Sequence, residues 1–392
     1  MANKIVNVPA GTPSGQMDWI KNNLQSNTSY KVKITGNAAI NPVDFNLPGM
    51  NDITIHLTGG GTERIIRLAP NVKGPLFKVR TGLTLILGKN IILQGHGSNG
   101  RSLVEADGGK LIMEYGSKII DNTAARGGGG VFATRGGNFI MKGGIISGNA
   151  ASNGGGGVFV AKDGTFTMEG GKITGNIATS ERGGGGVRVY GGDFIMKGGE
   201  ISGNNTSDYS SGGVRVGKGT FTMEGGIISG NTAVRGGGGV HVYDGEFIMR
   251  GGTVSGNTGG YQGGGGVRVA GGGIFIMEGG AISDNKAAKL GGGVLMWSGL
   301  FTMSGGEISG NTANHGGGMF VGGGIFRISN GIIYGSNWSN TAPRNTAAIG
   351  AALLGKGSST SQYGTFSGDT WNSIGSLPFS NDTIKVANGV LQ

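Results

Sequence analysis

One motif recurs along the chain at an almost constant interval. The tripeptide Phe-x-Met occurs seven times and is followed by one Phe-x-Ile, with the phenylalanines at Phe139, Phe166, Phe194, Phe221, Phe247, Phe275, Phe301 and Phe326. Successive members are 25 to 28 residues apart, and Leu111 and Leu85 extend the series toward the N-terminus. A period of roughly 20–50 residues is typical of solenoids and propellers, in which each unit stacks on the next.

Each unit holds three short strand-like pieces separated by glycine, for example Phe139–Met141, Ile145–Ser147 and Val158–Val160. WD40-type blades need about 40–45 residues, and leucine-rich repeats need a Leu-rich consensus, so neither architecture fits. Short strands can instead pair with their own copies about 4.8 Å above and below. We therefore predict an all-β, right-handed parallel β-helix with three short strands per coil and about 10–12 coils. The handedness follows from the preference for right-handed crossovers.

Side-chain alternation assigns the two faces of each strand. In Phe-x-Met the Phe and Met point inward, the second strand adds an inward Ile or Val, and both valines of the third strand's Val-x-Val point inward. An Asn follows the second strand in the repeated Ser-Gly-Asn. We expect this Asn to turn the coil and to form an amide ladder along the axis.

The residue after each Met alternates in charge along the repeats. We interpret this row as a structural ladder in which neighbouring coils attract one another, although block duplication of a two-coil unit also explains it. Each exposed pair contributes only about 0.2–1 kcal/mol, so its main effect is on register. The row contains Glu114, Lys142, Glu169, Lys197, Glu224, Arg250 and Glu278.

Composition excludes several kinds of site. The chain has no cysteine, and its four histidines are scattered, so we expect no metal and no cofactor. No apolar run is long enough for a membrane span. The net charge of +10 suits an acidic partner, but the repeats lack a concentrated basic patch, which argues against nucleic acid.

The two ends of the chain depart from the repeat. Residues 1–35 are expected to form a cap with a short helix in Thr12–Gln25, in which Thr12 is the N-cap and Pro13 opens the first turn. Residues 36–336 form the β-helix, regular from about residue 105, and residues 337–392 form a C-terminal cap or tail with a helix or coil at Thr346–Leu354 and a strand at Thr383–Val386.

A family resemblance rests on two parts of the sequence. One is the repeated unit with the pattern GGxFTMEGGxISGNTAxxGGGGVxV, and the other is the ending QYGTFSGDTWNS…NDTIKVANGVLQ. Over about residues 105–392 the chain resembles Gly-rich surface and secreted repeat proteins of bacteria, notably of the spirochaete type, that have a pectate-lyase-like β-helix. The resemblance implies a secreted or cell-surface location, with a leader removed before the first residue, and it implies no reaction.

The sequence offers no paired carboxylates of the kind that glycoside hydrolysis requires, and Asp244 and Glu246 beside His241 are the best local catalytic group. The alternative to a catalytic site is a binding surface on the third strand, formed by outward residues that combine basic and aromatic side chains. This predicted strip contains Arg188, Tyr190, Arg215, His241, Tyr243, Arg268 and Trp297. A second candidate edge consists of variable loops that carry Arg126, Arg182, Tyr209, Arg235, Tyr261, Lys289 and His315.

Two functions follow as hypotheses. The preferred one is a non-enzymatic extracellular or cell-surface scaffold that acts in adhesion, binds glycan or host matrix, or self-associates. The alternative is a polysaccharide-degrading lyase or glycoside hydrolase on the same fold, since a shared fold does not determine function. An ice-binding face is disfavoured because Thr167, Thr222 and Thr302 interleave with isoleucines on the outer face of the first strand.

Overall fold

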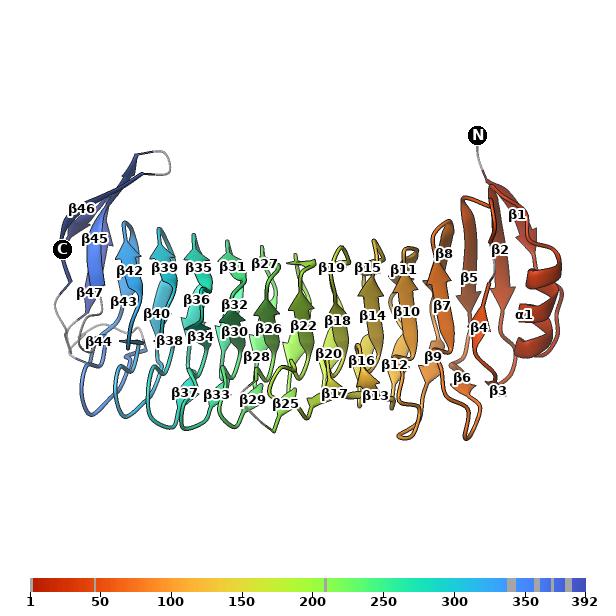
Figure 1. The fold of residues 1–392 in the computed structure, drawn as a ribbon, viewed down its shortest axis with the longest axis horizontal. Coiled ribbons are helices and arrows are strands. Elements are labelled where there is room, and N and C mark those ends of the chain that lie inside the picture. The colour runs from red at the N-terminus through yellow and green to blue at the C-terminus, as the bar shows by residue number, and fades with distance from the viewer. Residues whose placement is uncertain are drawn as a thin grey trace.

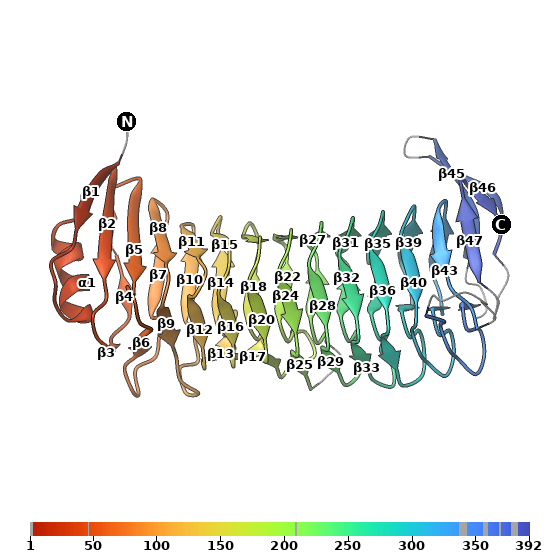
Figure 2. The same ribbon diagram turned by 180° about the vertical axis from the view of Figure 1, so that it is seen from behind.

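A computed structural model describes residues 3–45, 47–207, 210–336, 343–355, 360–367, 370–377 and 383–392. The chain winds into one elongated parallel solenoid of about twelve coils, with its termini at opposite ends (Figure 1). Seen from behind, the same succession of coils runs without interruption (Figure 2). The predicted all-β parallel solenoid with one short N-terminal helix is confirmed.

Within the described residues the strands form four sheets, of 15, 12, 14 and 7 strands. The 15-stranded sheet, in spatial order, contains β1 (Lys4–Asn7), β2 (Thr28–Lys33), β5 (Ile53–Thr58), β8 (Leu83–Leu87), β11 (Lys110–Met113), β15 (Asn138–Met141), β19 (Thr165–Met168), β23 (Asp193–Met196), β27 (Thr220–Met223), β31 (Glu246–Met249), β35 (Ile274–Met277), β39 (Leu300–Met303), β42 (Ile325–Ile328), β45 (Thr360–Ser367) and β46 (Thr370–Ser376).

The 12-stranded sheet contains β4 (Val43–Asp44), β7 (Phe77–Arg80), β10 (Val104–Asp107), β14 (Val131–Thr134), β18 (Val158–Val160), β22 (Val187–Tyr190), β26 (Val214–Gly217), β30 (Val240–Tyr243), β34 (Val267–Ala270), β38 (Val294–Met296), β41 (Met319–Val321) and β44 (Leu353–Gly355). The 14-stranded sheet contains β3 (Ala38–Ile40), β6 (Arg64–Leu68), β9 (Ile91–Gln94), β12 (Lys118–Ile120), β16 (Ile145–Ser147), β20 (Lys172–Thr174), β24 (Glu200–Ser202), β28 (Ile227–Ser229), β32 (Thr253–Ser255), β36 (Ala281–Ser283), β40 (Glu307–Ser309), β43 (Gly331–Ile333), β47 (Ile384–Ala387) and β48 (Val390–Leu391).

The seven-stranded sheet corrects the prediction of three strands per coil. Its members follow the turn after the 14-stranded sheet, and most are two residues long with one inward Ala, Thr or Gly. Such short, polar pieces carry no hydrophobic alternation that a sequence pattern could reveal. They are β13 (Thr123–Arg126), β17 (Ala150–Asn153), β21 (Ile177–Ala178), β25 (Asn205–Thr206), β29 (Thr232–Ala233), β33 (Thr258–Gly259) and β37 (Lys286–Ala287).

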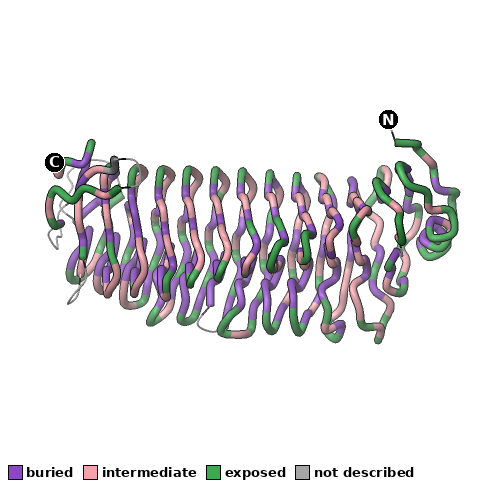
Figure 3. The backbone as a smooth tube through the Cα atoms, turned by 45° about the horizontal axis from the view of Figure 1, so that its top comes forward, coloured by how far each residue is buried: buried purple, intermediate pink, exposed green. Residues whose placement is uncertain are grey.

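The core is a set of columns of identical side chains, as predicted. The eight repeated phenylalanines are fully buried, and the rings of Phe166 and Phe194 stack with centroids 4.6 Å apart and an interplanar angle of 5°. The methionines, isoleucines and Val-x-Val valines form parallel buried columns in the same cluster. Buried residues recur in coil after coil along the solenoid (Figure 3). Each buried side chain of this size contributes about 1.5–3 kcal/mol.

The predicted amide ladder is confirmed and runs from Asn99 to Asn345. In its middle, the side-chain amide of Asn204 donates to Oδ1 of Asn231 at 3.0 Å, and the backbone N–H of Asn204 donates to the same oxygen at 3.0 Å. The turn is made differently from the prediction, because the left-handed residue is the preceding Gly203, with φ of 61°, and not the Asn. Glycine adopts this conformation without steric cost, which leaves the Asn free to point inward.

The end structures cover the open coils. Helix α1 (Pro13–Asn22) lies across the first coil with Met17 and Ile20 buried, and Oγ of its N-cap Thr12 accepts from the N–H of Gly15 at 3.1 Å. At the other end, β44 still pairs in parallel with β41, so the parallel stacking continues past residue 336. The antiparallel pair β45–β46 and the antiparallel strands β47 and β48 close this end.

The predicted charge ladder forms few contacts. All residues of this row lie within the described part of the chain. Arg250 and Glu278 form an ion pair at 3.0 Å, whereas the charged atoms of the other neighbouring pairs in the row are more than 4.0 Å apart. Glu114 instead lies 3.5 Å from His56. A pair that the sequence did not single out, Lys172 and Glu200, forms an ion pair at 2.8 Å on the neighbouring sheet.

Candidate ligand-binding groove

The 12-stranded sheet brings most of the predicted strip together. The middle residues of five successive Val-x-Val or equivalent strands lie in register, one per coil, so that Arg188 pairs with Arg215, Arg215 with His241, and His241 with Arg268. Leu295 continues this row on β38. We call these five residues the floor row.

The floor row lies deeper than the sequence predicted. Alternation correctly points these side chains away from the core, but Arg188 is only 8% exposed and His241 only 2%. Part of the cover comes from earlier coils: Nη1 of Arg188 donates to Oδ1 of Asn153 at 3.0 Å, and Nη1 of Arg215 donates to the carbonyl oxygen of Glu181 at 3.2 Å. The predicted flat strip is therefore the bottom of a groove.

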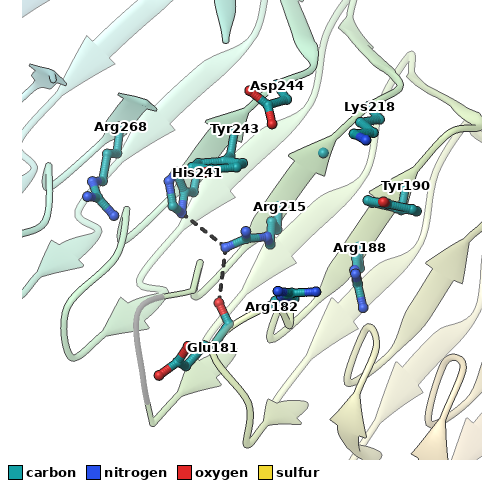
Figure 4. Close-up of a pocket in the computed structure, with 11 residues that line it drawn as sticks. Glu181, Arg182, Arg188, Tyr190, Arg215, Lys218, His241, Tyr243, Asp244 and Arg268 are labelled. Atoms are coloured by element: carbon teal, nitrogen blue, oxygen red, sulfur yellow. Dashed lines mark hydrogen bonds between the residues drawn. The ribbon is translucent and has the colours of Figure 1, made fainter. Parts of the chain in front are cut away.

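A hollow of about 480 Å³ opens above this row (Figure 4). Six of the seven predicted strip residues line it, and Trp297 is not among the lining residues. Five Lys or Arg and two Asp or Glu line the hollow, so its charge is strongly positive. The lining residues are Glu181, Arg182, Arg188, Tyr190, Arg215, Gly217, Lys218, His241, Tyr243, Asp244 and Arg268.

Arg188 is held by neutral groups. Its guanidinium carbon lies 4.8 Å from the ring centroid of Phe159 and 5.3 Å from that of Tyr190. Among the described residues, no carboxylate lies within 4.0 Å of this guanidinium. Burial is the main cause that lowers the pKa of Arg188 from its usual value. The side chain therefore carries a positive charge that aromatic faces and an amide only partly compensate.

Arg215 lies between two other cations. Burial, followed by the charges of Arg188 and Arg268, lowers its pKa to about 10. The guanidinium is still protonated at neutral pH, and its carbon lies 5.7 Å from the ring centroid of Tyr243. The positive charges in this row repel one another. An anion that binds beside them would therefore stabilise their charged forms.

Two further hollows continue the groove toward the N-terminus. The first, of about 500 Å³, shares Arg182, Arg188 and Tyr190 with the cationic hollow and contains the stacked rings of Phe132 and Phe159. The second, of about 450 Å³, shares Arg101 and Glu105 with the first. The groove thus follows the 12-stranded sheet from β4 to β34, a shape suited to an extended linear ligand.

Some lining residues were not among the predicted strip residues. Lys218 directly follows the last residue of β26, and Asp244 directly follows the last residue of β30. This common position after neighbouring strands is the sequence signal that places both at the same edge of the sheet. Arg182 belongs to the predicted loop set, whereas Tyr209 of that set lies outside the described residues. Among the described residues, no hydrogen bond joins His241, Asp244 and Glu246, the local group that the sequence suggested for catalysis. Oδ1 of Asp244 instead accepts from the N–H of Gly272 at 2.8 Å.

The described residues contain neither a metal-binding cluster nor a membrane-spanning helix. In the part of the chain that the structure describes, no group of three His, Asp or Glu side chains lies close enough to hold a metal ion. No helix among those residues has the length and apolar character that crossing a bilayer requires.

Comparison with known proteins agrees with this geometry. Residues 98–273 match the model of the family described as right handed beta helix region. Neither the curated proteins nor the solved structures include a significant match to the chain. The matched region covers most of the regular coils and the whole cationic hollow, and together with the parallel solenoid it supports a right-handed β-helix of the pectate-lyase-like kind.

Proposed function

We propose that this protein is a non-enzymatic extracellular or cell-surface scaffold whose groove binds an acidic polysaccharide. The observation that carries the proposal is the floor row, which places Arg188, Arg215 and Arg268 within four consecutive coils at the bottom of one hollow. Guanidinium groups recognise carboxylates and sulfates through paired hydrogen bonds.

The rings beside the floor row support a sugar ligand in particular. Tyr190 and Tyr243 line the same hollow and are 43% and 44% exposed. Aromatic faces pack against the apolar faces of sugar rings, while the guanidinium groups take the acidic substituents. The groove is open and extended. Its shape suits a linear polymer better than a small molecule.

A polysaccharide lyase is the second candidate, and one observation favours it. Lyases remove the proton from the carbon next to a sugar carboxylate. The bond between C4 of that sugar and the glycosidic oxygen then breaks, a double bond forms between C4 and C5, and the departing oxygen takes up a proton. The lowered pKa of Arg215, about 10, gives this residue a larger neutral fraction in alkaline solution than an ordinary arginine has. Arg188 and Arg268 would then neutralise the carboxylate.

The test measures binding and turnover on the same samples. Purified protein is titrated calorimetrically with acidic and neutral oligosaccharides of equal length, and the mixtures are then assayed for unsaturated and reducing ends from pH 6 to pH 10. Arg215→Gln is the variant, and Lys197→Gln, at an exposed lysine just after strand β23, is the control. Thermal unfolding confirms that both variants are folded.

Binding of acidic oligosaccharides that Arg215→Gln weakens by about tenfold, without any product, supports the scaffold. Unsaturated product that increases toward pH 10 and disappears in Arg215→Gln would replace the scaffold with the lyase. If no acidic oligosaccharide binds and none is degraded, both functions are wrong.

A further inference from the structure

The residues beside the floor row alternate between large and small. On successive coils this outer row contains Tyr190, Gly217, Tyr243, Ala270 and Trp297, so an aromatic ring occurs on every second coil. The three rings are 43%, 44% and 37% exposed. Since neighbouring coils are about 4.8 Å apart, successive rings repeat at roughly 9.6 Å.

Each ring rests against a glycine of the following coil. A Cβ atom added to Gly217 would lie 3.3 Å from Cδ2 of Tyr190, one on Gly271 would lie 3.2 Å from Cε2 of Tyr243, and one on Gly322 would lie 2.8 Å from Cε3 of Trp297. The missing side chains leave room for part of each ring against the following coil. The rest of each ring is exposed and can contact a ligand.

The floor row alternates in step with the rings. On the three coils that carry a ring the floor residue is buried, as Arg188 at 8%, His241 at 2% and Leu295 at 0% exposure show. On the two intervening coils, where the outer residue is Gly217 or Ala270, the floor residues are the arginines Arg215 and Arg268, and both are partly buried. Coils that carry an exposed ring thus alternate with coils that carry no ring and have an arginine of the hollow on the floor.

We propose that the ligand is a linear polysaccharide in which an acidic sugar alternates with an uncharged one. This inference rests on the proposed function and specifies its ligand. Uncharged sugars stack on Tyr190, Tyr243 and Trp297, and the acidic sugars between them meet Arg215 and Arg268. The two-coil repeat is comparable to the length of a disaccharide in an extended chain, so the same contacts recur along the axis.

The experiment compares three hexasaccharides in calorimetric titrations with the full chain. Hyaluronan alternates a carboxylated and an uncharged sugar, oligogalacturonate carries a carboxylate on every sugar, and cellohexaose carries none. We expect hyaluronan to bind at least about tenfold more tightly than either of the others, although oligogalacturonate has twice its charge. The reason is that only the alternating chain offers an uncharged sugar to each ring and an acidic sugar to each arginine between the rings.

Variants separate the two kinds of subsite. Arg268→Gln should weaken hyaluronan binding by about tenfold and make it less sensitive to salt, whereas Tyr243→Ala should weaken it by a similar factor and leave the salt sensitivity unchanged. Tyr115→Ala, at a tyrosine that is 73% exposed outside the groove, is the matched control and should bind as the unaltered protein does.

The outcomes distinguish the two proposals. If oligogalacturonate binds as tightly as hyaluronan, or more tightly, the alternation has no role in recognition, and the proposed function survives without this inference. If neither acidic hexasaccharide binds and no longer acidic polymer does, the proposed function itself is wrong. Equal losses of affinity in Tyr115→Ala and Tyr243→Ala would also contradict the inference.

Discussion

Arg215 and His241 face each other across neighbouring coils, with Nη1 of Arg215 3.4 Å from Nδ1 of His241. A guanidinium can only donate, so Nδ1 accepts and Nε2 carries the ring proton. Within the described part of the chain, Nε2 has no hydrogen-bond partner. Burial, followed by the charges of Arg215 and Arg268, holds the pKa of His241 well below its usual range, so the imidazole is neutral in the folded protein.

This relationship predicts a loss of stability in mild acid. Below a pH of about 6.5 the unfolded chain binds a proton at His241 that the folded chain rejects, so the free energy of unfolding falls as pH decreases, by up to about 1.4 kcal/mol per pH unit. His241→Gln removes this contribution. Urea unfolding at pH 7.5, 6 and 5 should show a shallower decrease for the variant than for the unaltered protein. Parallel curves would show that His241 becomes protonated in the folded state.

Asp107, in the early coils, also loses its contribution to stability as pH falls, but here the folded state favours the charged form. Burial alone would raise the pKa of this carboxyl, but hydrogen bonds from Arg135 and Lys78 outweigh it and hold the pKa below its usual value. Its contribution is therefore present above a pH of about 4 and is lost as pH falls through the lowered folded pKa. Asp107→Asn should lower the free energy of unfolding by about 2 kcal/mol at pH 6, with the difference from the unaltered protein shrinking by pH 3. Asp193→Asn, at an exposed position, is the control and should change it little.

The sequence predicted the columns of the core well because each column contains one residue type at one period. The phenylalanines from Phe139 to Phe326 stack on one another in only one register of the strands. If a strand shifted by one residue, its phenylalanine would point to solvent instead of into the core. The inward Asn of Ser-Gly-Asn was equally clear, since its position after the second strand never changes within the repeats.

The groove was harder to predict because its depth depends on loops. Alternation along β22 places Arg188 outside the core, but it cannot show that Asn153, 35 residues earlier, reaches the guanidinium. The charge ladder forms few direct ion pairs for a related reason. Side chains such as Lys142 and Glu169 are exposed, and solvent competes with their attraction, so the pattern of charges does not determine which pairs meet.

The amide ladder predicts a large effect from a single polar substitution. Oδ1 of Asn204 accepts from Asn176, and its amide donates to the carbonyl oxygen of Ile173 and to Asn231. Asn204→Ala would leave these buried groups without partners, so we expect the free energy of unfolding to fall by about 3 kcal/mol in denaturant titrations. The neighbouring exposed Asn205→Ala should change it by less than about 0.5 kcal/mol. Similar effects of the two substitutions would mean that the ladder does not stabilise the coils.

The glycine runs predict a steric limit on the turns. A Cβ atom at Gly154 would overlap the carbonyl oxygen of Gly127 in the preceding coil, and both atoms belong to backbone that stacked neighbours hold in place. Gly154→Ala should therefore push two coils apart and lower the midpoint of thermal unfolding by at least about 1 °C, as expected for a loss of more than about 1 kcal/mol from a chain of this length. Gly61→Ala is the matched control, because nothing lies within 4 Å of its added Cβ and its backbone is not left-handed. A midpoint for Gly154→Ala equal to that of the control would show that neighbouring coils can separate at this turn without cost.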